Sequence, residues 1–341
     1  MLAGDAVTQS GWQRLADGVW HSNKVHQGYA RHVSDVEHAS EFIADTAPLM
    51  PLFKDEPEYL DRLRHSARHF EDLWTAVTPR GHRFFRSSWY SSSAVETEEP
   101  KGRDTEYNCR AVKALRFLAW RAEDAGVIDL LEEWSAAWLS AALRTDKGKP
   151  RGIIPPSVRF PDEAINGDQT EWYRANMFWP YFDWEQSDGS RMLDQLLFTY
   201  SMTDDPKFLQ PMFLALELIR SEGPSASARP ERADRRGSLS WTAQRLAASE
   251  LFWHVVAHWR FLTGDAQWDD LLMKYGSPYA RFRISRDPKH LEHGLEKVLE
   301  SVRYNTPLLT TEAIHTDRVY VPGAAHLKAM LSGAGFEESL S

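Results

Sequence analysis

Four times in this chain a helical segment ends in an acidic turn and a second helical segment starts at once. The turns are KDEPEYL (with Asp55), AEDAGVI (Asp124), TDDPKFL (Asp205) and TGDAQWD (Asp265). They recur at intervals of about 60 to 80 residues, so each unit holds two helices and a long return segment. The repeat predicts an all-α chain of helical hairpins, with the short turns at one end and the long loops at the other.

The first two hairpins indicate where their helices begin. The first helix is expected to start with Ser34 as its N-cap and Glu37 three residues later, which is the spacing of a capping box. The second hairpin is expected to start a helix at Asp104. Its second helix places Trp134 and Trp138 on one apolar stripe. Both rings should therefore be buried between helices.

A later segment, residues 240–265, reads as one long helix. Apolar residues occupy nearly every side of it between Leu246 and Leu262. A helix that is hydrophobic all round is expected to be buried on all sides.

Composition limits the classes of protein to which the chain can belong. It has 341 residues, of which 42% are hydrophobic, enough for a substantial core. Its formal charge of −9 argues against a nucleic-acid partner, which normally requires a basic surface. No apolar run reaches the ~18 residues of a membrane span, so no membrane partner is expected. The single Cys109 excludes an internal disulfide and a multi-cysteine zinc site.

The segment 146–188 is the candidate working surface. At about 40 residues it is far longer than the ~12 to 15 at which an irregular connection usually has a function. Its rings suit the apolar face of a sugar, and neighbouring polar groups suit the hydroxyl rim. They are Trp172, Tyr173, Phe178, Trp179, Tyr181, Phe182 and Trp184. The alternative is that the rings plug one end of a helical domain.

The repeat of hairpins with long aromatic loops resembles the α/α toroids of carbohydrate-active proteins, both the toroid polysaccharide lyases and the six-hairpin glycosidases. The resemblance covers residues 34–333 and implies a complete or incomplete toroid there, with 1–33 as a lead-in and 334–341 as a tail. A HEAT or armadillo solenoid is the alternative, although its period is more regular and its loops shorter. The opening residues read like the middle of a domain, so we expect a piece of a longer protein, periplasmic or secreted if a signal peptide was removed.

Likeness to the toroid lyases implies a polysaccharide or oligosaccharide substrate containing uronic acid, cleaved by β-elimination without a cofactor. In those enzymes Asn, Gln or Arg neutralises the uronate, His or Tyr removes the C5 proton, and Tyr protonates the leaving oxygen. The residues expected in these roles are His38, Tyr107, Asn108, Arg174 and Tyr181. The residues expected to bind substrate are Trp172, Tyr173, Asn176, Trp179, Asp183, Arg245, His315, Arg318 and Tyr320.

Two other functions remain open. A six-hairpin glycoside hydrolase would need two carboxylates flanking the scissile bond. The candidates are Asp104, Glu106, Asp183, Glu185 and Glu312. A non-catalytic carbohydrate-binding domain would use the rings alone and release no product.

A histidine-rich run near the N-terminus raises the question of a metal. His26, His32, Asp35 and His38 lie close together in sequence, but they lack the i, i+4 spacing of two ligands on one helix face. We therefore expect no metal site. His38 alone is a candidate base, because a position in the first turn of a helix can lower its pKa.

Overall fold

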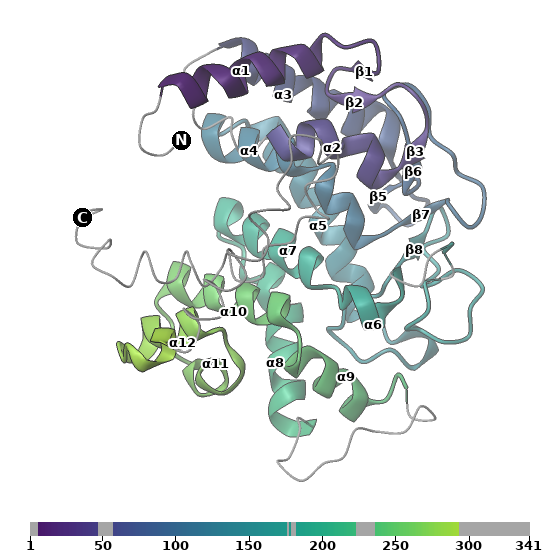
Figure 1. Ribbon diagram of the computed structural model, residues 1–341. Helices are drawn as coiled ribbons and strands as arrows, with labels where there is room; N and C mark the ends of the chain where they lie inside the picture. The colour runs from purple at the N-terminus through teal and green to yellow at the C-terminus, as the bar shows by residue number, and fades with distance from the viewer. Residues whose placement is uncertain (1–5, 47–56, 176, 179–181, 223–235, 293–341) are drawn as a thin grey trace. The chain divides into compact units, whose positions relative to one another are not determined.

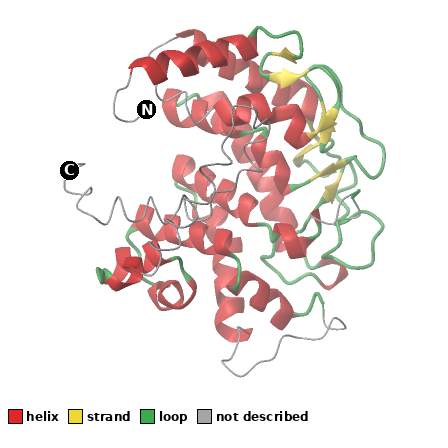
Figure 2. Ribbon diagram, in the orientation of Figure 1, coloured by secondary structure: helices red, strands yellow, loops and turns green. Residues whose placement is uncertain are grey.

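The computed structural model describes residues 6–46, 57–175, 177–178, 182–222 and 236–292. The chain divides into two compact units, unit 1 (Met1–Leu246) and unit 2 (Ala247–Ser341). In the described residues the chain is mostly helical and its strands are short, as Figure 2 shows. The prediction of a mainly α-helical chain is confirmed.

Helices build both units (Figure 1). In unit 1 the described α-helices are α1 (Ala6–Trp20), α2 (Val36–Thr46), α3 (Pro57–His69), α4 (Lys113–Ala122), α5 (Ala125–Leu143), α6 (Trp184–Ser187), α7 (Ser190–Thr203), α8 (Gln210–Glu222) and α9 (Leu239–Ala247), whose last residue is the first of unit 2. Shorter turns are the π-helix η2 (Phe70–Trp74) and the 3-10 helices η3 (Glu106–Arg110), η4 (Asp146–Gly148) and η6 (Pro206–Leu209). In unit 2 the described helices are α10 (Glu250–Thr263), α11 (Asp269–Tyr275) and α12 (Pro278–Ser285).

Neighbouring helices of unit 1 pack against one another in chain order. α3 contacts α4, α4 contacts α5, α5 contacts α7, and α7 contacts η6, which leads into α8. Further contacts join α2 to α4, α4 to α7 and α5 to α8. Thus α2, α4 and α7 form one row, with α3 and α5 packed against α4 and with α8 beside α5.

Short antiparallel strand pairs lie along one side of the unit 1 helices (Figure 2). The pairs are β1 (Val25–His26) with β2 (Tyr29–Ala30), β3 (Ser34–Asp35) with β6 (Trp89–Tyr90), β4 (Thr75–Val77) with β5 (Arg83–Phe85), and β7 (Arg103–Asp104) with β8 (Val158–Arg159). In the β3–β6 pair, Asp35 lies opposite Trp89. This register brings the beginning of α2 next to the segment around β6.

The expected N-cap of the first helix is wrong by one residue. Ser34 lies in β3, and α2 starts after Asp35. The Oδ1 atom of Asp35 accepts the backbone N–H of His38 at 3.1 Å, so Asp35 supplies the capping oxygen. Strand pairing with Tyr90 holds Ser34 in the extended conformation.

The prediction that a helix begins at Asp104 is also wrong. Asp104 lies in β7, and η3 comes before α4. Pairing with Val158 of β8 keeps the backbone of Asp104 extended, and its carboxylate is buried. Its Oδ2 atom accepts the N–H of Phe85 (3.1 Å) and the ring N–H of Trp134 (2.8 Å) and Trp138 (3.0 Å). Its Oδ1 atom accepts Nδ2–H of Asn108 at 2.8 Å. Both tryptophans are buried as predicted, and one carboxylate ties α5 to β5 and η3.

Three of the four acidic turns lie in the described residues, and each aspartate caps the helix or turn that follows. Asp124 accepts the N–H of Val127 at the start of α5. Asp205 caps η6 at the N–H of Lys207, and Asp265 accepts the N–H of Gln267 before α11. Asp55 lies outside the described residues. Asp124 and Asp205 therefore mark helix starts because their side chains satisfy free N–H groups there, whereas Asp265 caps only the turn that precedes α11.

The long helix expected over 240–265 is two helices. α9 ends at Ala247 and α10 starts at Glu250, where Ser249 accepts the N–H of Phe252 at 3.1 Å and so caps the second helix. Leu251 and Leu262 on α10 are exposed, so this helix is not buried on all sides.

Candidate functional site

The beginning of α7 meets η3 at a partly buried ion pair. The Oε1 atom of Glu106 accepts Nη1–H of Arg191 at 2.7 Å, and its Oε2 atom accepts the backbone N–H of the same arginine at 3.2 Å. Glu106 is buried, whereas the Arg191 side chain is 40% exposed. Burial raises the pKa of Glu106 to about 8, and the neighbouring Arg191 opposes that rise. A buried carboxyl thus holds a half-exposed cation.

Tyr107 completes this group, called here the Arg191 cluster (Glu106, Tyr107 and Arg191). The guanidinium carbon of Arg191 lies 4.7 Å from the centre of the Tyr107 ring, within cation–π distance. The ring also makes an edge-to-face contact with Phe182, at 4.9 Å between centroids. Burial raises the pKa of the Tyr107 phenol, so it stays protonated at neutral pH. The cluster therefore joins a cation and a phenol.

The first turn of α2 lies beside this cluster, because α2 packs against η3. Arg110 of η3 approaches Glu37 of α2, with 3.9 Å between Nη1 and Oε1. On the same turn, Nδ1 of His38 lies 2.9 Å from Oδ1 and 3.1 Å from Oδ2 of Asp35. The His38 side chain is 50% exposed.

The environment of His38 corrects one expectation. Its pKa is raised, chiefly by the hydrogen bond to Asp35, and burial opposes this less strongly. The expected lowering by the helix terminus is therefore wrong. In the neutral ring, a proton on Nδ1 satisfies Asp35 and leaves Nε2 as the basic nitrogen. An aspartate that orients an imidazole in this way is an arrangement suited to a general base.

Asn108 and Arg174, which were expected to hold a uronate together, lie in different environments. Asn108 is wholly buried, and its amide donates to Asp104. No atom of this side chain can reach a sugar, so its place is structural. Arg174 is exposed and donates through Nη1 to Oδ2 of Asp183 at 2.7 Å. Asp183 also accepts the N–H of Ala175 at 2.8 Å, so it braces the long segment.

The expected sugar-binding rings in the first part of the aromatic run pack inside unit 1. Trp172 is buried, its Nε1–H donates to the carbonyl of Gly237 at 3.0 Å, and its ring packs on Trp184 and Trp241. Tyr173 is half-buried against Trp241. Trp172 therefore stabilises the contact between the long segment and α9 and offers no face to a sugar.

The remaining expected residues stay predictions. Arg245 is exposed on α9. The others lie outside the described residues: Asn176, Trp179, Tyr181, His315, Arg318 and Tyr320.

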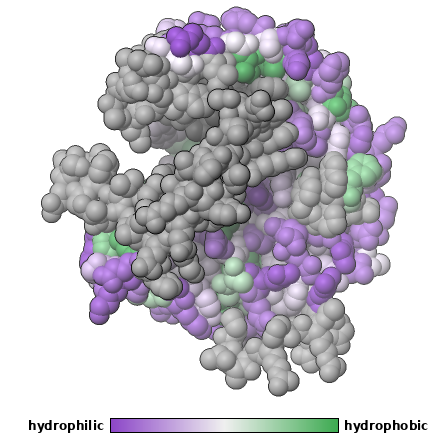
Figure 3. All heavy atoms as spheres, in the orientation of Figure 1, coloured by the Kyte–Doolittle hydropathy of each residue, from purple (hydrophilic) through white to green (hydrophobic). Residues whose placement is uncertain are grey.

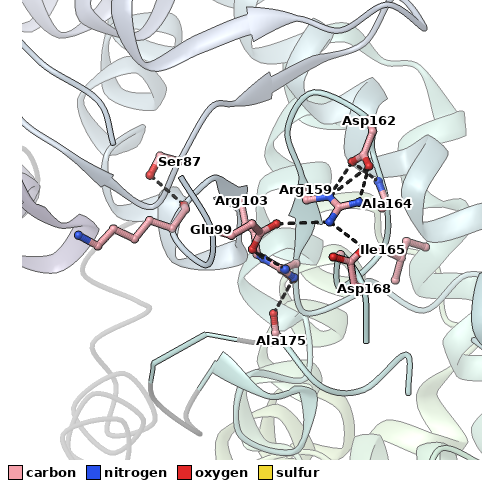
Figure 4. A network of polar contacts seen from close by, with 12 residues as sticks. Ser87, Glu99, Arg103, Arg159, Asp162, Ala164, Ile165, Asp168 and Ala175 are labelled. Carbon is pink, nitrogen blue, oxygen red and sulfur yellow. Dashed lines mark hydrogen bonds and ion pairs between the residues drawn. The ribbon is translucent and has the colours of Figure 1, made fainter. Parts of the chain in front are cut away.

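A network of arginines and carboxylates holds the long segment in place (Figure 4). Arg103 is wholly buried; its Nε and Nη2 donate to Oε2 of Glu99 at 2.9 and 2.6 Å, and its Nη1 donates to the carbonyl of Ala175 at 3.0 Å. Arg159 binds Asp162 and Asp168 within the same segment and lies 3.6 Å from Glu99. These contacts fix Ala175, and with it the beginning of the aromatic stretch that follows.

Glycine is required at one point of this network. Gly167 has a φ of +55°, and a Cβ there would overlap the guanidinium group of Arg103. The close approach of the backbone to Arg103 explains why a residue without a side chain is found at this position.

Sequence reasoning did not foresee the pairing of Glu106 with Arg191. Glu106 was a candidate carboxylate for hydrolysis, but the two residues are 85 positions apart and no local pattern joins them. The one feature of the sequence that could have pointed to Arg191 is its position in the first turn of the helix that follows the long segment.

The described part of the chain also bears on other kinds of site. Within it, no three His, Cys, Asp or Glu side chains are grouped so as to hold a metal ion. None of the described helices has the length and apolarity to cross a membrane. On the face shown in Figure 3, the described side chains are mainly hydrophilic and the hydrophobic areas are small and separate.

Comparison with known proteins gives no family for the chain. No protein-family model, no curated protein and no solved structure matches it.

Proposed function

We propose that this chain cleaves a uronic-acid-containing polysaccharide by β-elimination at the Arg191 cluster. The observation that supports this most is a half-exposed arginine held by a buried carboxylate against a protonated phenol. α2, which packs against η3, carries a histidine oriented by an aspartate. A cation, a proton donor and a base are the three groups that the elimination requires.

Arg191 supplies the cation that binds the uronate carboxylate. Its Nη1 donates to Glu106, and a guanidinium has further N–H groups that can bind a second carboxylate. Neutralising the uronate makes the C5 proton more acidic, because negative charge that develops beside the carboxylate is then stabilised.

His38 and Tyr107 move the protons. Neutral His38 takes the C5 proton on Nε2, the C4–O bond breaks, and a double bond forms between C4 and C5. Tyr107 gives its phenolic proton to the departing oxygen, which suits a phenol whose raised pKa keeps it protonated. Because Asp35 raises the pKa of His38, turnover should increase as the pH rises and the imidazole loses its proton.

The fold that we propose for this site is an α/α toroid. The row formed by α2, α4 and α7 supports it, since each of these helices is followed by a partner helix that packs beside it or beside its neighbour. In a toroid these three would be inner helices, and the residues at their N-terminal ends would face a central cleft. Asp35, His38 and Arg191 are at or near such ends.

A glycoside hydrolase is the second candidate, and one observation favours it. With a pKa of about 8, Glu106 would carry a proton for much of the time at neutral pH, as a general acid must. Burial counts against this candidate, because Glu106 and Asp104 are both buried, and Asp104 also accepts four hydrogen bonds. Elimination remains our preferred proposal because it also uses the cation and the histidine.

The test is turnover of acidic polymers by matched arginine variants. Alginate, glucuronan, pectin, ulvan and glycosaminoglycans would be supplied, and the ultraviolet absorbance of the unsaturated product followed. Arg191→Ala should lower kcat by ~10² to 10³, the effect of removing one preorganised charge-stabilising group. Arg64→Ala is the control, because Arg64 is 45% exposed and paired with Asp61 on α3. Equal turnover of both variants would refute the role of Arg191, and binding without any product would favour a non-catalytic sugar-binding domain.

A further inference from the structure

Phe178 is one of two large aromatic side chains that are mostly exposed in the described residues. It is 55% exposed, and Trp120 on α4 is 56% exposed. The Trp120 ring packs on the half-buried Phe117, with 5.7 Å between centroids. The Phe178 ring packs edge-to-face on Trp89, with 5.6 Å between centroids, and Trp89 is itself buried. Phe178 thus stands on a rigid aromatic support.

That support leads to the Arg191 cluster. Trp89 packs with the buried Phe182 at 6.3 Å between centroids, and Phe182 packs on Tyr107 at 4.9 Å. Trp89, Phe182 and Ala175 form one buried apolar group, against which Tyr107 packs. A continuous row of rings therefore connects exposed Phe178 to the phenol beneath Arg191.

The row of rings is also connected, through Trp89, to the aspartate that binds His38, the proposed base. Trp89 in β6 lies opposite Asp35 in β3, and Asp35 binds His38. The N–H of Trp89 also donates to Oγ of Ser87 at 2.8 Å, which holds the backbone at this point. Strand pairing thus holds Trp89, the ring on which Phe178 packs, beside the aspartate that binds the proposed base.

A cation lies beside Trp89, the ring that supports Phe178. Nζ of Lys101 is 5.9 Å from the centre of the Trp89 ring, while it also pairs with Glu96. An aromatic face with a nearby ammonium group suits a sugar ring that carries a carboxylate, since the ring stacks and the carboxylate is attracted.

We infer that Phe178 forms a stacking subsite for a uronic-acid ring that neighbours the ring bound at the Arg191 cluster. The inference rests on the proposed function and names the part of the substrate that the platform binds. Because Phe178 already packs on Trp89, its side chain loses little conformational entropy when a sugar binds. Stacking on Phe178 therefore contributes to the affinity for long chains. It touches no reacting atom, and it should affect binding more than turnover.

The test compares Phe178→Ala with Phe178→Trp and with Trp120→Ala, the matched exposed aromatic. Stacking is worth about 0.5–1.5 kcal/mol, so Phe178→Ala should raise KM for the polymer by up to about tenfold, with kcat changed less than about twofold. Phe178→Trp should keep the wild-type KM, and Trp120→Ala should change neither constant. Thermal melts of each variant would confirm that the fold is intact.

Retardation of each protein in gels containing the polymer measures binding without turnover. Loss of retardation in Phe178→Ala alone supports the subsite even if no product forms, in which case only the proposed reaction fails. Equal retardation and equal KM in Phe178→Ala and the wild type would overturn the subsite while leaving the reaction standing.

Discussion

His69 shows how one buried residue should make the stability of the protein depend on pH. Its ring stacks on Trp74, with 5.3 Å between centroids, and meets the edge of Tyr29 at 5.6 Å. Nε2 of His69 is buried without a hydrogen-bond partner. Burial, and to a smaller degree the nearby His26 and His65, lower the pKa of His69 to about 4.

Between its unfolded pKa of 6.5 and its folded pKa of about 4, His69 binds more protons in the unfolded chain. Its contribution to stability is therefore complete above pH 6.5 and is lost as the pH falls toward 4. We expect this residue to account for a loss of about 3 kcal/mol over that range. Urea unfolding of the wild type and His69→Phe at pH 7 and pH 4 measures it. The prediction is contradicted if both proteins lose the same stability.

Single residues also show what sequence can and cannot reveal. Burial of Trp134 and Trp138 followed from their spacing on an apolar stripe, but their common acceptor, Asp104, did not. Asp104 is 30 residues or more from either ring, and a carboxylate usually prefers water. The pairing of Glu106 with Arg191 was hidden for the same reason, because helical periodicity reports which face is apolar and not which polar groups meet.

At the scale of elements, the acidic turns at Asp124 and Asp205 predicted helix starts because a cap is a local interaction. Asp124, Asp205 and Asp265 each bind an N–H group two or three residues later. The two-residue strands could not be predicted in this way. β3 exists only because β6, more than fifty residues later, lies beside it, and this pairing turned the expected cap at Ser34 into strand.

The cap at Asp124 can be tested directly. Asp124→Ala should lower the free energy of unfolding by about 1 kcal/mol, because the N–H of Val127 loses its acceptor at the start of α5. Asp129→Ala on the same helix is the control, since Asp129 is exposed beyond the first turn. Urea denaturation at pH 7 compares the two. Similar losses in both variants would show that general helix charge, and not the cap, is responsible.

At the scale of the whole molecule, the negative charge of −9 requires that an acidic substrate be bound by local cations. Arg191 and Lys101 both contact the row of rings in unit 1, at Tyr107 and Trp89 respectively. Long-range repulsion between protein and polymer is screened by salt, whereas contacts at a partly buried arginine are screened less. Binding at the Arg191 cluster should therefore persist at physiological ionic strength.

The most direct measurement of the central claim is the mass of the products from a defined uronic-acid hexasaccharide. Elimination breaks the C4–O bond without adding water, so the masses of the two fragments should together equal the mass of the substrate, and one fragment should carry an unsaturated end. Hydrolysis adds one water to that combined mass and leaves both ends saturated. Mass spectrometry of the digest distinguishes the two. Two results would contradict the claim that this protein is a lyase. One is a pair of fragments whose combined mass exceeds that of the substrate by one water. The other is that hexasaccharides prepared from each of the acidic polymers all remain uncleaved.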